Sequence, residues 1–128
     1  EQPYHFIELH LAPESGVRRA QVHFFGDDQA QRADAPAACH TVVLDLEFTR
    51  IGALWVSLRH SGGHCACRFQ SPSSAVRDAI ADTRQELTDA LLAAGYQSAQ
   101  ISTADWNGDR IAALAAIMDR FGGLNLNV

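Results

Sequence analysis

The chain has 128 residues, of which 47% are hydrophobic and 20% are charged, and its formal net charge is −5. This length fits one domain with a hydrophobic core, and no apolar run is long enough to cross a membrane, which argues against membrane insertion. The ten basic residues are scattered, which argues against nucleic acid or an anionic membrane as the main partner and favours a protein partner.

Residues 1–25 are predicted to form a hairpin. Two strand-like segments flank the turn-forming residues 13–16. Pairing the segments about this turn places apolar side chains opposite one another on one face, Leu9 with Ala20 and Ile7 with Val22.

Residues 26–40 are polar and rich in alanine, and Pro36 interrupts them, so they predict a flexible connection. The chain begins at Glu1 without a signal-peptide pattern, and we therefore expect it to be a domain excised from a longer protein.

A second hairpin is predicted from Thr41 onward, where apolar and polar residues alternate. A three-residue loop, Arg50-Ile51-Gly52, ends in a glycine at a position that requires positive φ. This loop predicts that the following residues face one another: Phe48 and Leu54, Leu46 and Val56, Leu44 and Leu58.

A third hairpin is predicted to turn at Gly62-Gly63. This register places Cys65 opposite His60 and Cys67 opposite Leu58, with both cysteines on the apolar face. Core packing is favoured, because a reduced cysteine behaves as a small hydrophobic residue and the paired Cys-x₂-Cys spacing of structural zinc sites is absent. The alternative is a zinc site formed by His60, Cys65 and Cys67, which share a face, with Cys39 or His40 as the fourth ligand.

The C-terminal half predicts two helices. Residues 71–95 form one long amphipathic helix, capped by Ser73 or Ser74 and ended by Gly95. The remaining elements follow in order, a strand at 98–103, a helix at 107–121 and a possible strand at 124–128. The pattern predicts an α+β, two-layer fold in which antiparallel hairpins pack against the long helix, with a second C-terminal helix.

The stretch from Phe48 to Ser102 resembles the C-terminal domain of flagellar hook-length control proteins, the specificity-switch domain of type III secretion. The motifs that carry the resemblance are Ile51-Gly52, the alternating Leu54, Val56 and Leu58, the turn Gly62-Gly63, Val76-Arg77-Asp78-Ala79, Leu87, Leu91, Gly95 and Ile101-Ser102. Phe48 replaces the proline usual in the family, and the predicted C-terminal helix replaces its flexible tail. A needle-length regulator of a virulence secretion system is therefore an alternative.

The resemblance implies a single, non-enzymatic domain without cofactors, which contacts the export-gate switch protein. It also implies a location in the bacterial cytoplasm, followed by export through the flagellar secretion channel. The expected division is an accessory hairpin (1–25), a flexible connection (26–40), a core like that of hook-length control proteins (41–103), and a C-terminal helix and strand (104–128). The expected partner-binding residues are Ile51, Gly52, Leu54, Trp55 and Val56.

The outer face of the central hairpins offers a candidate docking surface. Trp55 is its one large aromatic residue among polar neighbours, which is typical of an interaction hot spot. Whether Trp55 is exposed for docking or is buried stays open. The N-terminal hairpin could instead bury Trp55, and the partner surface would then lie on the exposed side of the helix at 74–94, around Arg77, Arg84 and Glu86. A small metal-binding domain is a further alternative to the docking function.

Overall fold

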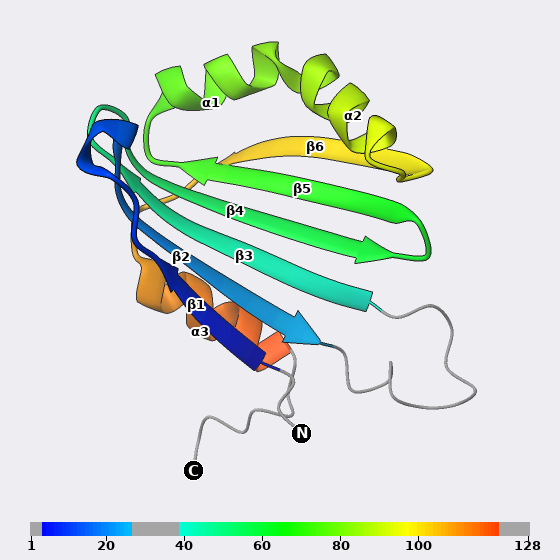
Figure 1. The fold of residues 1–128 in the computed structure, drawn as a ribbon, viewed down its shortest axis with the longest axis horizontal. Coiled ribbons are helices and arrows are strands. Elements are labelled where there is room, and N and C mark those ends of the chain that lie inside the picture. Colours follow the sequence, from blue (N-terminus) through cyan, green and yellow to red (C-terminus); the bar gives the residue numbers. More distant parts are fainter. Residues whose placement is uncertain (1–3, 27–38, 121–128) are drawn as a thin grey trace.

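The computed structural model describes residues 4–26 and 39–120. Six strands form one sheet whose spatial order, β1 to β6, is also their order in the chain (Figure 1). Neighbouring strands are antiparallel except β5 and β6, which are parallel. The elements are β1 (Tyr4–Leu9), the short 3-10 helix η1 (Pro13–Ser15), β2 (Val17–Gly26), β3 (Cys39–Phe48), β4 (Gly52–Ser61), β5 (His64–Ser71), α1 (Ser74–Asp82), α2 (Arg84–Ala93), β6 (Ser98–Asp105) and α3 (Arg110–Arg120).

The predicted N-terminal hairpin is confirmed, with Leu9 opposite Ala20 and Ile7 opposite Val22. Its second strand, β2, also pairs with β3, so the hairpin continues the main sheet. Most of the predicted connection at 26–40 lies outside the described residues, as does the predicted strand at 124–128.

The predicted register of the second hairpin is wrong by two residues. Gly52 has the expected positive φ of 79°, but it pairs with Phe48, and the loop therefore consists of residues 49–51. Leu54 consequently lies opposite Leu46, and Val56 lies opposite Leu44. A shift of two residues keeps every side chain on the same face, so the alternating pattern fits both registers equally well.

The third hairpin is confirmed. Gly62 and Gly63 have φ values of 57° and 85°, as a two-residue turn of this twist requires, and Cys67 lies opposite Leu58. The strand predicted at 98–103 corresponds to β6, and the helix predicted at 107–121 corresponds to α3.

The single helix predicted over 71–95 is wrong, because two helices, α1 and α2, meet at Thr83. Ser73 caps α1 as predicted, since its Oγ accepts a hydrogen bond from the Val76 amide at 3.3 Å. The Thr83 hydroxyl donates to the carbonyl oxygen of Ile80 at 3.0 Å, and its backbone leaves the helical region at φ −99° and ψ 13°. Such bonding back to the preceding turn competes with regular helix geometry.

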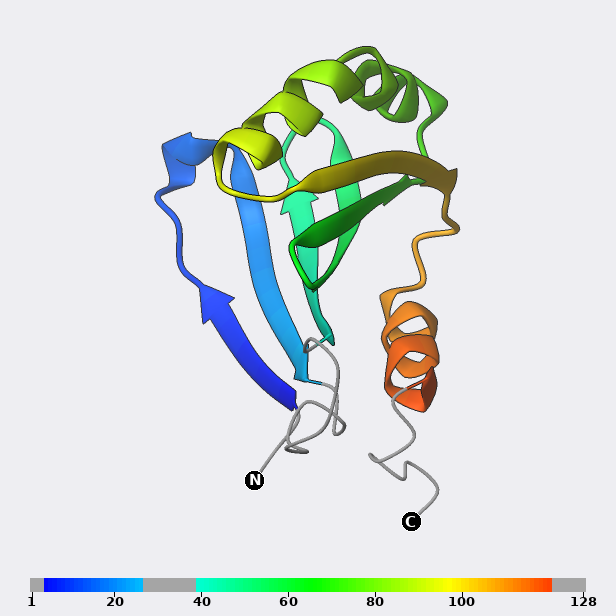
Figure 2. The same ribbon diagram turned by 90° about the vertical axis from the view of Figure 1, so that its right-hand side faces the viewer.

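The fold is α+β as predicted, because the sheet is mostly antiparallel. Helices lie on both faces of the sheet, so α3 adds a third layer to the two that were expected (Figure 2). On the first face, the α1–α2 face, the two helices pack over β5 and β6. On the opposite face, the α3 face, Ile117 packs with side chains of β2, β3 and β4. Successive side chains of a strand point to opposite faces, so each strand contributes to both cores.

Candidate protein-docking site

The turn between β3 and β4 carries the expected site residues. Ile51 is 44% exposed at the tip of the turn. Leu54 and Val56 are buried on the α1–α2 face, whereas Trp55 is buried on the α3 face. The Thr49 amide donates to the carbonyl of Gly16 at 3.0 Å, which holds this turn beside the turn of the N-terminal hairpin. Of the expected set, the turn residue Ile51 therefore lies at the surface.

Trp55 belongs to the core beneath α3. Only 1% of its surface is exposed, and its ring centroid lies 5.6 Å from that of Trp106. Phe25 of β2 contributes to the same core, but Ile117 of α3 and Trp106 complete it. The alternative in which Trp55 is buried is thus the one observed, and α3 supplies much of the cover that was expected from the N-terminal hairpin.

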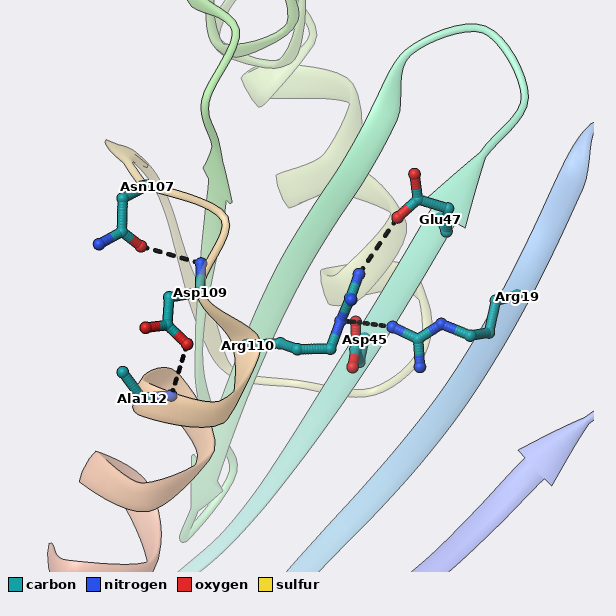
Figure 3. A network of polar contacts seen from close by, with 7 residues as sticks. All are labelled: Arg19, Asp45, Glu47, Asn107, Asp109, Arg110 and Ala112. Atoms are coloured by element: carbon teal, nitrogen blue, oxygen red, sulfur yellow. Dashed lines mark hydrogen bonds and ion pairs between the residues drawn. The ribbon is translucent and has the colours of Figure 1, made fainter.

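A network of charges fixes α3 to the sheet (Figure 3). Oδ1 of Asp45, a residue that is 2% exposed, accepts hydrogen bonds from Arg19 Nη2 at 3.0 Å and from Arg110 Nε at 3.2 Å. Arg110 Nη2 also donates to Glu47 at 3.1 Å. This network was not predicted from the sequence, although an aspartate inside an apolar strand indicates that a cationic partner is needed.

The start of α3 is capped within the chain. The Asp109 carboxylate accepts from the Ala112 amide at 3.0 Å, and the Asn107 side chain accepts from the Asp109 amide at 2.9 Å (Figure 3). These bonds satisfy backbone donors at the N-terminus of α3, next to Arg110.

An apolar strip runs across β1, β2 and β3 on the α1–α2 face. Its most exposed members are Ile7 at 48%, Leu9 at 44% and Phe24 at 36%. Half-buried side chains of the same face fill the strip between them and β4: Val22, Val42, Leu44 and Leu46. The helices α1 and α2 pack over β5 and β6. The apolar side chains on this part of the same face therefore stay partly exposed.

The exposed side of the two helices is the other surface considered from sequence. Arg84 and Glu86 of α2 are exposed there. Arg77 is engaged, since it donates to the carbonyl of Ser71 at 2.6 Å and to Asp105 at 3.1 Å. Arg77 therefore anchors α1 to the ends of β5 and β6.

Cys65 and Cys67 lie in the apolar core beneath α2, as predicted. They are 4% and 6% exposed and cluster with Ile101, against which Leu87 and Leu91 pack. Burial raises the pKa of Cys67 to about 12, and the neighbouring Cys65 contributes to the rise. Among the described residues, no group of three or more His, Cys, Asp or Glu side chains is arranged to hold a metal ion. The side chain of Cys39 lies outside the described residues.

The comparison with known families decides which family the chain belongs to. The sequence profile of the family described as "Flagellar hook-length control protein FliK" matches residues 28–110. The chain belongs to this family. The match runs from before β3 to the first residue of α3, and it therefore includes the β3–β4 turn, all three cysteines and Trp106. No curated protein and no solved structure matches the chain. None of the described helices of this hook-length control domain has the length and apolar character needed to span a bilayer.

Proposed function

We propose that this domain is a non-enzymatic docking module that switches the export specificity of the flagellar type III secretion apparatus. It acts by contacting the cytoplasmic domain of the export-gate switch protein. The family match over residues 28–110 carries the proposal. In this proposal the protein works in the bacterial cytoplasm without a cofactor and is then exported through the flagellar channel.

The apolar strip, together with the adjoining β3–β4 turn, is the proposed contact surface. Contiguous apolar surface that is left partly exposed on a folded domain often marks a protein interaction site. Ile51 makes direct contact from the turn, Gly52 gives the turn its shape, and Leu54 and Val56 form the floor that continues into the strip. Trp55 supports β4 from the opposite face and acts through the position of the strand.

The division of the chain that was expected from the sequence fits this surface. Residues 41–103 form the proposed core, and the accessory hairpin at 1–25 widens the strip, because Ile7 and Phe24 belong to β1 and β2. The segment at 104–128 includes α3, which packs on the other face and leaves the strip accessible.

The test replaces exposed apolar side chains and measures binding to the export-gate cytoplasmic domain by isothermal titration calorimetry. Ile7→Ser and Phe24→Ser should each weaken binding about tenfold or more, as expected for central interface residues. Ile111→Ser is the matched control, because Ile111 is 79% exposed and lies on α3. All three variants should keep the wild-type circular dichroism spectrum. Equal binding by all three variants and the wild type would place the contact elsewhere.

A further inference from the structure

A groove of about 1010 Å³ lies between α3 and the sheet, away from the apolar strip. Its floor is the α3 face of β4, β5 and β6, and it continues past β6 to Arg84 of α2. Its wall is α3, which begins at the residue where the family match ends. The groove therefore depends on an element that lies almost wholly beyond the matched region.

Three arginines line the groove. Arg59 on β4 and Arg68 on β5 share the α3 face of the sheet and are diagonal neighbours, since Arg59 lies opposite Ala66. Arg68 and Arg84 are exposed, and their side chains form no hydrogen bond or ion pair with other described residues. Among the described lining residues the one carboxylate is Asp109, which caps α3. The positive charge of Arg68 and Arg84 favours an anionic ligand.

A buried donor in the lining lacks an acceptor. Trp106 is 7% exposed, and its indole Nε1 has no hydrogen-bond partner among the described residues. Buried polar groups in folded proteins are nearly always paired, so an orphaned donor needs an explanation. A ligand that offers oxygen acceptors supplies one.

The outer edge of β6 favours a ligand in an extended conformation. β6 is the last strand of the sheet, and no other described strand pairs with its outer edge. Side chains from both faces of β6, Ala99 and Ile101 on one and Gln100 and Ser102 on the other, line the groove. An extended peptide can add to such an edge through main-chain hydrogen bonds. The alanines of α3 that line the wall, Ala112, Ala113 and Ala116, suit a ligand with an apolar side.

We propose that this groove binds an extended acidic peptide segment of a partner protein. The peptide lies along the outer edge of β6, and its carboxylates pair with Arg68 and Arg84. Guanidinium groups bind carboxylates through paired, charge-assisted hydrogen bonds, which gives both affinity and geometry. The site lies apart from the apolar strip and does not rest on the proposed export function.

The experiment uses tryptophan fluorescence of the whole chain, because its two tryptophans, Trp55 and Trp106, both line the groove. The probe is a short synthetic peptide in which glutamate alternates with valine. The controls are peptides with lysine or glutamine in place of glutamate. We expect a saturable fluorescence change with the glutamate peptide alone, and salt should weaken it. Arg68→Gln should raise Kd about tenfold, whereas Arg50→Gln, a substitution in the exposed β3–β4 turn, should leave Kd unchanged.

Several outcomes would overturn the proposal. Equal responses to the glutamate and lysine peptides, or equal Kd values for the two arginine variants, would remove the role of charge. Tighter binding of polyphosphate or a single-stranded oligonucleotide than of the peptide would make the site one for phosphates. Loss of peptide binding in Ile7→Ser would move the ligand to the apolar strip. Arg68→Glu provides a second check, because it should reverse the preference in favour of the lysine peptide.

Discussion

Arg110 of α3 donates from Nε to the buried Oδ1 of Asp45 on β3 at 3.2 Å, across 65 positions of sequence. The same oxygen accepts from Arg19 of β2 at 3.0 Å. One carboxylate thus connects two neighbouring strands and the helix that covers them. This carboxylate has little access to water, so the two guanidinium groups compensate its negative charge in place of solvent.

Removal of this carboxylate should be more harmful than removal of either arginine. Asp45→Ala should lower the free energy of unfolding by about 2–3 kcal/mol, because two cations then lose a buried partner. Arg110→Ala should cost about 1 kcal/mol, because Arg110 is partly exposed and water can replace part of its interaction. Urea unfolding followed by tryptophan fluorescence measures both values, with Arg50→Ala as the control. A larger loss in Arg110→Ala than in Asp45→Ala would contradict the central role of Asp45.

Trp55 should be a stability residue. Trp55→Ala removes a side chain that is 1% exposed from between the sheet and α3, and should cost about 3–5 kcal/mol. Trp55→Phe, which keeps an aromatic ring, should cost clearly less. Circular dichroism during urea unfolding measures the difference. An unchanged midpoint in Trp55→Ala would mean that α3 does not cover Trp55 in solution.

Gly52 should be required for the β3–β4 turn. A side chain added there meets no atom within 4 Å, so the cost of Gly52→Val comes from its φ of 79°. A β-branched residue in this conformation costs about 1–2 kcal/mol, which corresponds to a melting temperature lower by roughly 3–8 °C. Gly52→Asn should lose less, because asparagine tolerates positive φ. The prediction fails if valine and asparagine melt alike.

Cys65 and Cys67 should react slowly with iodoacetamide in the folded protein and rapidly in denaturant, as measured by mass spectrometry of each site. Only the thiolate reacts, and burial raises the pKa of both thiols. The folded state therefore keeps the Cys67 proton while the unfolded state loses it above a pKa of 9.0, so stability should fall between pH 9.0 and about 12.

Replacement of Cys65 and Cys67 by alanine tests whether these buried thiols cause the loss of stability at alkaline pH. The double variant should lose about 1–2 kcal/mol of stability at neutral pH through lost apolar burial. It should also lose part of the alkaline destabilisation. Metal analysis of the wild type and the variant distinguishes this from the zinc alternative, since zinc that disappears with the cysteines would contradict the core assignment.

His23 should make the fold sensitive to acid. Burial lowers the pKa of this histidine below 6.5, Asp45 opposes the shift, and Arg19 adds to it. The unfolded state takes up the proton more readily, so the contribution to stability is complete above pH 6.5 and is lost as the pH falls below that value. His23→Gln should show a smaller loss of melting temperature between neutral pH and about pH 5 than the wild type. His10→Gln, an exposed control, should behave as the wild type.

Local patterns predicted most of the elements and two of the three hairpin registers. The turns at residues 13–16 and at Gly62-Gly63 fix the number of loop residues, and pairing followed from that number. At Gly52 the same reasoning gave the correct backbone conformation but the wrong partner. The pattern repeats every two residues, so it distinguishes the faces of a strand but not a shift of two along it.

Contacts between distant parts of the chain could not be predicted in the same way. Trp55 has polar neighbours along its face, and its burial depends on Trp106 and Ile117, more than fifty residues further on. The pairing of Asp45 with Arg110 likewise joins residues that are far apart in the sequence. The break between the helices at Thr83 was not predicted, because the apolar spacing continues from α1 into α2. The break coincides with a hydrogen bond from the Thr83 hydroxyl to the carbonyl oxygen of Ile80.

The order of the strands bears on how the domain can be unravelled. Strands that are neighbours in the described sheet are also consecutive in the chain, with β1 at one edge and β6 at the other. A pull on the N-terminus first loads β1, and its bonds to β2 can open one after another, beginning with the pair Tyr4 and Phe25. β2 then becomes the edge strand, and β3 follows it. A narrow channel can therefore take up the sheet in chain order, and no strand has to be withdrawn from between two neighbours.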